Sequence, residues 1–353
     1  MSDDDHDGLG ASAESQAGDE TKDWEAHNKA IQDGYIELLA PLFLPKDPTK
    51  PDILDYFCAL LRVGGWEDGG WDPYGESRVV LNEIHELMKV ELPEKHFPDH
   101  EKTIIRLGLI FYSHIVEMDA PYEVIANLLR FKLDLGYSLQ PFFDFLSAKE
   151  QKQYRYSGIY PSKKIEIIKK LGLEAGLDLG SMFDDFYDNG LRNAISHSSF
   201  AITDTELRCR SWKVGKSFSL TLQELDEKIL CAKLFIGAFF ALEVEARRQC
   251  GEAAGRALAY DPHYKGIMEV LVNEEGLMDG YKVHWPNGSD SYYRRTPQGA
   301  KLVNCLPSAK RPAVELFVGL YARQRSQFSP LVEQGAEPIY TPLENGEPTV
   351  WAP

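Results

Sequence analysis

Apolar residues recur at helical spacing through the middle of the chain, and this pattern constrains the fold more than any other feature. Between residues 101 and 118 they fall at positions i, i+3 and i+4, which places them on one face of an α-helix. The stripe consists of Leu107, Ile110, Phe111, His114, Ile115 and Met118. A second strong signal is the capping box of Thr221 and Glu224, which opens a further run of apolar residues at the same spacing. Residues 101–252 are therefore predicted to form a helical domain.

The remaining elements of this domain fit the same interpretation. Helices are predicted over residues 124–133, 161–173 and about 179–200. The alternating segment 206–218 is predicted to be a hairpin that turns at Gly215. Because helices dominate and the strand signal is confined to a short segment, the predicted fold class is mainly α.

The segments on either side of this domain have different compositions. Residues 1–25 carry nine acids and one lysine, with Met1 and Leu9 as the only large apolar residues before Trp24, so we expect a disordered acidic tail. Residues 26–100 are expected to form a helical extension. Residues 255–353 are expected to form a small α+β region with an extended, proline-rich end. In that region a hairpin is predicted around Asn287 and Gly288, and a short helix over residues 314–325.

A glycine-rich loop is predicted over residues 63–75. Its aromatic residues Trp66, Trp71 and Tyr74 could form an exposed stacking surface or pack the loop against the core. We favour packing, because aromatic side chains mostly bury their area.

The charge balance limits the classes of partner. Lys and Arg number 38 and Asp and Glu number 55, which gives a net charge of −17. A chain this acidic is not expected to coat DNA through its whole surface, although it can hold a local basic groove.

The sequence also predicts where the protein works. It contains no run of about 18 apolar residues and no signal-peptide pattern at its start, so neither a membrane span nor secretion is expected. The five cysteines lack Cys-x-x-Cys spacing, which argues against a zinc site or a disulfide framework. We expect a cytoplasmic protein with reduced thiols, no metal and no cofactor.

An arginine–asparagine pair followed by a histidine is the motif that points to chemistry. Asn193 and His197 are four residues apart, so they share a helix face and can hydrogen-bond, which would fix the tautomer of the imidazole. Arg192 and His197 are five apart, or about 140° around an ideal helix. They can form one site only if the helix is distorted near His197 or if a second chain completes the site.

This motif resembles that of the HEPN superfamily, small helical domains of which many are ribonucleases. In that family an arginine is followed after four to six residues by a histidine, and a polar residue, often Asn, stands directly after the arginine. Here Arg192, Asn193 and His197 match the four-residue form. The surroundings are similar as well, since a short strand after Phe200 and then a long amphipathic helix are predicted. The resemblance covers residues 101–252 and implies an all-α bundle that dimerises with the two motifs facing each other.

The resemblance implies metal-independent cleavage of RNA, in which the 2′-hydroxyl attacks the adjacent phosphorus and leaves a 2′,3′-cyclic phosphate. His197 would transfer protons, and Arg192 would stabilise the charge on the phosphorane. Asn193 would orient His197 or the phosphate. The expected protein is a homodimeric RNA endonuclease, a toxin or a stress or defence effector, with an antitoxin or a regulatory protein as a further partner. Members that pair with a nucleotidyltransferase antitoxin often carry Tyr two positions after the histidine, where this chain has Ser199.

Two other interpretations stay open. Many members of the family keep the fold without the activity, so the chain could be a catalytically silent module that binds RNA, a nucleotide or a partner protein. Arg192 could also serve only the fold by pairing with Asp185 or Asp188, and His197 could be an ordinary histidine at a helix end.

Basic segments near the motif are candidates for RNA binding. Arg208, Arg210 and Lys213 follow the motif in a stretch without acidic residues. The helix predicted over 161–173 carries four further lysines, which we interpret as a solvated face. These are Lys163, Lys164, Lys169 and Lys170.

The hairpin near residue 288 alternates aromatic and cationic residues, a pattern that suits either base stacking or core packing. Those residues are Trp285, Tyr292, Tyr293, Arg294 and Arg295.

One further cluster contains potential metal ligands. His114 and Glu117 are three residues apart, and Asp119 follows in the next turn. Because His114 belongs to the apolar stripe, we favour a hydrogen-bonded core histidine over a ligand. Glu117 could border a catalytic cleft and support it.

Overall fold

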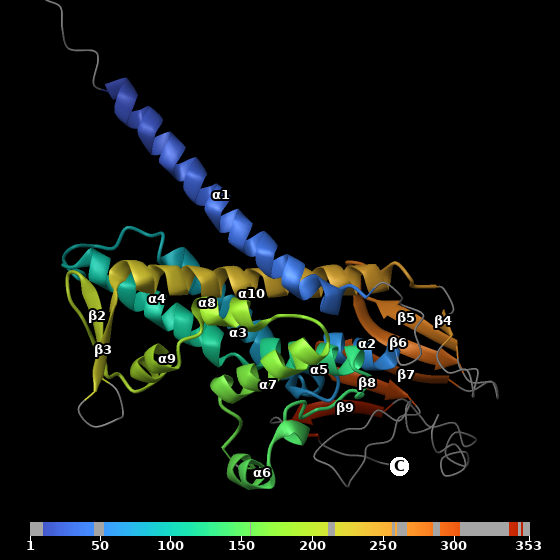
Figure 1. The fold of residues 1–353 in the computed structure, drawn as a ribbon. Helices are drawn as coiled ribbons and strands as arrows, with labels where there is room; N and C mark the ends of the chain where they lie inside the picture. The colour runs from blue at the N-terminus through green and yellow to red at the C-terminus, as the bar shows by residue number, and fades with distance from the viewer. Residues whose placement is uncertain are drawn as a thin grey trace, which may run out of the picture.

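The computed structural model describes residues 10–45, 53–155, 157–210, 216–255, 258–259, 267–284, 290–303, 339–344 and 347–348. Within these residues the protein is mainly helical, with a small antiparallel sheet at one end of the helical body and a larger one at the other (Figure 1). The predicted fold class is therefore confirmed at the level of a mainly α protein.

The helices differ widely in length. They are α1 (Gly10–Phe43), α2 (Ile53–Leu61), α3 (Pro73–Leu87), α4 (His100–Glu117), α5 (Asp119–Lys132), α6 (Ala148–Tyr154), α7 (Pro161–Glu174), α8 (Gly180–Phe186), α9 (Asn189–Ser196) and α10 (Leu222–Gly251), with the short 3-10 helices η1 (Trp66–Gly69) and η2 (Phe143–Phe145).

Helix α10 runs along the body and links its two ends (Figure 1). It begins with the predicted capping box, in which the Thr221 hydroxyl accepts from the backbone N–H of Glu224 at 3.1 Å and the Glu224 carboxylate accepts from the Thr221 N–H at 2.8 Å. Its 30 residues span about 45 Å at 1.5 Å per residue. It packs against α1, α4 and α8, and also against strands of both sheets. The two sheets are therefore held far apart by one continuous helix.

The small sheet lies beside the start of α10. Its strands β1 (Phe200–Ile202), β2 (Glu206–Arg210) and β3 (Ser217–Thr221) are antiparallel in the order β1-β2-β3. The strand pairing predicted over residues 206–218 is thus confirmed, while the predicted turn at Gly215 falls outside the described residues. Leu207 and Cys209 are buried, which turns the alternate residues of β2 to solvent.

The large sheet is an antiparallel meander. Its strands are β4 (Leu258–Ala259), β5 (Ile267–Val272), β6 (Met278–His284), β7 (Asp290–Thr296), β8 (Gly299–Val303), β9 (Ile339–Glu344) and β10 (Glu347–Pro348), in the order β10-β9-β8-β7-β6-β5-β4. The hairpin predicted around residue 288 is confirmed in its pairing, since Val283 lies opposite Ser291. Residues 285–289 and the helix predicted over 314–325 lie outside the described residues.

One face of the large sheet joins the core of the helical body. Tyr281 and Tyr293 are fully buried and stack with their ring centroids 5.7 Å apart. Phe57 of α2 stacks on Tyr281 at 6.4 Å. We expected three separate segments, residues 26–100, 101–252 and 255–353. All three contribute residues to a single hydrophobic core.

Helix α1 is longer than its apolar pattern indicates. Residues 10–25, for which we expected disorder, belong in the structure to its N-terminal part, and residues 1–9 lie outside the described range. The segment contains Ala, Glu, Gln and Lys, which are good helix formers. Its C-terminal part is anchored by the buried residues Tyr35, Leu39 and Phe43, so the helix can propagate from an existing nucleus.

The single helix predicted over residues 179–200 was wrong, because two helices occupy this range. α8 ends at Phe186, and α9 begins after Asp188, whose side chain caps it. The hydroxyl of the buried Tyr112 accepts a hydrogen bond from the Asp188 N–H at 3.1 Å and donates one to the Phe186 carbonyl at 2.9 Å. A tertiary contact thus stabilises the break.

The glycine-rich loop differs from its prediction as well. Trp66 and Trp71 are 62% and 51% exposed, with ring centroids 6.2 Å apart, whereas Tyr74 is buried. Acidic residues hold the loop in place instead of the tryptophans: Glu67 pairs with Arg62 at 2.5 Å, and Asp68 accepts from the N–H of Gly64 at 2.5 Å. The packing prediction was therefore wrong for the two tryptophans.

Candidate active site

Helix α9 carries the Arg–Asn–His motif and lies against α4 and β2. It begins after Asp188, whose carboxylate accepts a hydrogen bond from the Leu191 N–H at 2.9 Å. Leu191 and Ala194 are buried, so they define the face of α9 that meets the body. The Arg192 side chain is 16% exposed and reaches α4 from the edge of that face.

Glu117, the last residue of α4, is the partner of Arg192. The guanidinium donates from Nε to Oε1 and from Nη2 to Oε2, the second bond being 2.8 Å long. Two parallel charge-assisted hydrogen bonds of this kind fix both the position and the plane of a guanidinium. The hydrogen bonding to Glu117 also raises the pKa of Arg192, so the cation is permanent.

Polar neighbours on α9 complete the arrangement. The side-chain oxygen of Asn193 accepts a hydrogen bond from Arg192 Nη1 at 3.0 Å, and the Ser196 hydroxyl donates to Glu117 at 3.4 Å. The bonds that the described residues make with Arg192 use three of its five N–H groups. One N–H on each terminal nitrogen remains for a phosphate oxygen.

His197 lies at the end of α9, where the helix geometry stops. Its backbone takes φ −104° and ψ 9°, and Ser198 follows with φ 51° in the left-handed region. Ser199 donates to the carbonyl of Ala194 and Ser198 to that of Ile195, which is a Schellman ending. The backbone therefore departs from ideal helical geometry at His197, and the His197 side chain is exposed.

The structure places the three acids that could pair with Arg192 in different roles. Asp185 accepts a hydrogen bond from Tyr35 at 2.9 Å, and Asp188 caps α9. Glu117, which the sequence suggested only as a support of a cleft, makes the ion pair. Sequence spacing could not select it, because 75 residues separate it from Arg192.

The cluster of His114, Glu117 and Asp119 does not come together as a ligand set. Asp119 pairs with Lys164 at 2.5 Å, and Glu117 faces Arg192. The buried Nε2 of His114 has no hydrogen-bond partner among the described residues, so the expectation of a hydrogen-bonded core histidine was wrong for that atom. Burial lowers the pKa of His114. Among the described residues, no group of three or more His, Cys, Asp or Glu side chains is placed to hold a metal ion.

The basic residues that follow the motif differ in their contacts. Arg208 and Arg210 are exposed on the outer side of β2, and Arg208 pairs with Glu206 at 2.6 Å. Lys213 lies outside the described residues.

The lysines of α7 are engaged in ion pairs. Lys163 pairs with Glu166 at 2.8 Å, and Lys169 pairs with Asp184 at 2.5 Å. Lys164, which we expected on a solvated face, is buried and pairs with Asp119, and its ammonium lies 5.7 Å from the centroid of the Phe142 ring. This face is therefore not a solvated row of free cations.

Comparison of the chain with family models, with curated proteins and with solved structures gives no significant match. Among the helices within the described ranges, none combines the length and the apolar character that crossing a membrane requires.

Proposed function

We propose that the protein is a metal-independent RNA endonuclease of the HEPN type. The observation that carries the proposal is the guanidinium of Arg192, which Glu117 and Asn193 hold in one orientation on the short helix that ends at the exposed His197. A fixed cation next to a proton-transfer group is what phosphodiester cleavage without a metal requires.

The reaction assigns each residue a role. The 2′-oxygen attacks the adjacent phosphorus, the bond to the 5′-oxygen of the next nucleotide breaks, and the products are a 2′,3′-cyclic phosphate and a 5′-hydroxyl. His197 takes the proton of the 2′-hydroxyl or delivers one to the leaving 5′-oxygen. The two remaining N–H groups of Arg192 bind the phosphorane oxygens, and Asn193 and Glu117 position that guanidinium.

A second copy of the chain would supply the other proton-transfer group, as the family resemblance implies. Ile110 supports a contact on this side, because it lies two turns before Glu117 on the same face of α4 and is 53% exposed. Its exposure also differs from the buried position that the apolar stripe predicts. We therefore propose a homodimer in which α4 and α9 of both copies meet.

A silent HEPN-like module that binds RNA or a partner protein is the second candidate. It is favoured by the carboxylate of Glu117, which neutralises Arg192 and would compete with an incoming phosphate. In that case the ion pair serves the fold, and no chemistry follows.

One experiment separates the two candidates. Purified protein is incubated with total RNA and tRNA in the presence of EDTA, beside the variant Arg192→Ala/His197→Ala. The variant His96→Ala/Arg155→Ala is the matched control, because it removes the same residue types from exposed positions elsewhere. Cleavage that ends in a 2′,3′-cyclic phosphate, present in the wild type and the control and absent in the first variant, supports the enzyme. RNA binding without cleavage in all three proteins favours the silent module.

A further inference from the structure

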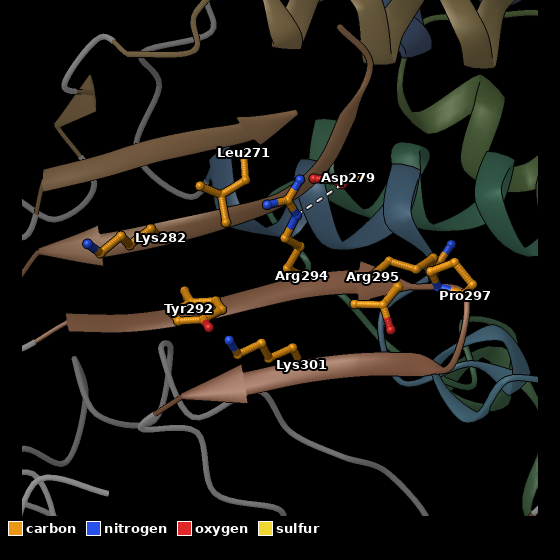
Figure 2. A pocket seen from close by; sticks show the side chains of 9 residues that line it. Leu271, Asp279, Lys282, Tyr292, Arg294, Arg295, Pro297 and Lys301 are labelled. Atoms are coloured by element: carbon orange, nitrogen blue, oxygen red, sulfur yellow. Dashed lines mark hydrogen bonds and ion pairs between the residues drawn. The ribbon is translucent and has the colours of Figure 1, made fainter. Parts of the chain in front are cut away.

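The outer face of the large sheet carries a pocket at the end of the molecule remote from Arg192. It is open, has a volume of about 500 Å³, and is formed over strands β5 to β8. Figure 2 shows its lining side chains on neighbouring strands. These are Leu271, Asp279, Lys282, Tyr292, Arg294, Arg295, Thr296, Pro297 and Lys301.

Strand register explains why cations gather in this pocket. Lys282 lies opposite Tyr292, and Arg294 lies opposite Lys301, so these four side chains share one face of the sheet. Tyr293 and Arg295 alternate to the other face, where Tyr293 is buried and Arg295 donates to the carbonyl of Arg62 and to Asp68, both at 3.3 Å. Tyr293 thus packs in the core, whereas Lys282, Tyr292, Arg294 and Lys301 line the pocket, which Arg295 also borders.

The cations of the pocket are oriented and partly buried. Arg294 bonds Asp279 at 3.1 Å and the carbonyl of Val272 at 2.9 Å, yet 42% of its side chain remains exposed. Lys301 lies over the ring of Tyr292, with its ammonium 5.6 Å from the ring centroid. Two acids lie near these cations: Asp279 lines the pocket, and Glu269 is the cross-strand neighbour of Lys282. On a chain with a net charge of −17, such a set of cations is a local exception.

The chemistry of these side chains selects the class of ligand. Cations that flank an aromatic ring on an open sheet face match a single-stranded nucleic acid, whose phosphates pair with the cations and whose bases stack on the ring. An acidic peptide would use the cations but would leave the ring of Tyr292 and the apolar side chain of Leu271 without a planar partner.

From these contacts we infer that the pocket over β5 to β8 binds single-stranded RNA, with Lys282, Arg294 and Lys301 on its phosphates and Tyr292 against a base. This inference rests on the proposed function, since it assigns the pocket to the RNA that Arg192 and His197 cleave. The pocket and the candidate active site lie at opposite ends of α10, a helix of about 45 Å (Figure 1). The pocket therefore acts as an exosite for long RNA rather than as a part of the cleavage site.

The test measures binding and cleavage separately. Binding is measured by fluorescence anisotropy with a labelled single-stranded RNA of about 30 nucleotides, in full-length protein that carries Arg192→Ala/His197→Ala so that the probe stays intact. The pocket variant Lys282→Gln/Lys301→Gln is compared with Lys89→Gln/Lys170→Gln, which removes two exposed lysines elsewhere. Tyr292→Ala is compared with Tyr292→Phe, which keeps the ring.

The pocket variant is expected to bind the RNA at least tenfold more weakly, while the control pair changes affinity less than twofold. The slope of log K against log salt should become shallower by about 1.4, because each phosphate contact contributes about 0.7 for a single strand. Tyr292→Ala should weaken binding about fivefold or more, and Tyr292→Phe should not. Equal effects of the two lysine pairs would overturn the inference, and so would equally tight, pocket-dependent binding of polyglutamate, which would assign the pocket to an acidic protein.

The cleavage assay shows which proposal fails. In protein with the wild-type active site, the pocket variant should cleave an RNA of about 8 nucleotides at the normal rate and long RNA at least fivefold more slowly. Pocket-dependent binding by a protein that never cleaves RNA would refute the proposed enzyme and leave the binding site. Normal cleavage together with binding that ignores the pocket variants would refute only the exosite.

Discussion

Arg192 and Glu117 join α9 to α4 through two parallel hydrogen bonds across 75 residues of sequence. The pair has a structural consequence and a chemical one. It fixes α9 against the body, and it orients the guanidinium while leaving two of its N–H groups for a ligand. The two roles can be separated by a substitution that keeps the positive charge of Arg192 but removes its two-point contact with Glu117. Such a substitution should lower RNA cleavage only if the guanidinium takes part in the reaction.

Arg192→Lys makes that distinction. A lysine keeps the positive charge but cannot form the two-point contact with Glu117. We expect the free energy of unfolding to fall by about 1–2 kcal/mol, the scale of one charge-assisted hydrogen bond, and RNA cleavage to fall at least tenfold. Urea unfolding and the EDTA cleavage assay give the two values. Arg248→Lys is the control, since its exposed pairs with Glu245 and Glu252 should change neither quantity measurably. Full cleavage by Arg192→Lys would mean that the arginine fork has no part in the reaction.

The end of α9 provides a second prediction. Ser198 has φ 51°, a conformation that glycine adopts without the steric cost that a Cβ atom brings. Ser198→Gly should therefore stabilise the protein by about 0.5–1 kcal/mol. Ser196→Gly, two residues earlier and inside the helix, should destabilise it by a similar amount. Thermal or urea unfolding of both variants tests this, and destabilisation by Ser198→Gly would show that the Schellman ending is not formed.

A buried ion pair at the other end of the body gives a prediction about pH. Glu243 is 2% exposed, bonds Arg62 at 2.5 Å and accepts from Tyr74. Burial alone would raise its pKa, but Arg62 and Tyr74 outweigh burial, and the pKa lies below its ordinary value of 4.5. The carboxylate then contributes stability that is complete above pH 4.5 and is lost as the pH falls further.

Glu243→Gln should remove this pH dependence and lower stability at pH 7 by about 1.5–3 kcal/mol, the scale of a hydrogen bond to a charged group, because Arg62 would keep Glu67 as a partner but lose the carboxylate of Glu243. Urea unfolding between pH 3.5 and pH 7 measures both effects. Glu86→Gln serves as the control, since its pair with Lys89 lies fully at the surface. An unfolding curve that stays equally pH-dependent in Glu243→Gln would show that another carboxyl group is responsible.

Local sequence patterns predicted the elements whose stabilising contacts are themselves local. The capping box of Thr221 and Glu224 closes within four residues, and the hairpin of β6 and β7 pairs neighbouring strands. Both were predicted correctly, because spacing along the chain carries the relevant information.

The parts that the sequence did not predict depend on distant residues. Asp68 anchors the glycine-rich loop by accepting a hydrogen bond from Tyr293, which lies 225 residues away, while Trp66 of the same loop is exposed. The break between α8 and α9 needs Tyr112 from α4. Long-range hydrogen bonds of this kind have no signature in a single sequence. Amphipathic periodicity therefore predicted one helix in place of α8 and α9, and the general tendency of aromatic side chains to be buried predicted that the tryptophans pack inward.

His114 offers the last prediction, because its buried Nε2 has no partner in the described structure and burial lowers its pKa below the ordinary value of 6.5. Below pH 6.5 the unfolded chain therefore binds a proton that the folded protein does not, and stability falls as the pH decreases from that value. His114→Leu should reduce the loss of stability between pH 7.5 and pH 5.5, as measured by urea unfolding, whereas His96→Leu, at an exposed position, should not. An unchanged loss in His114→Leu would mean that the imidazole finds a partner in solution, for example across the proposed dimer contact of α4.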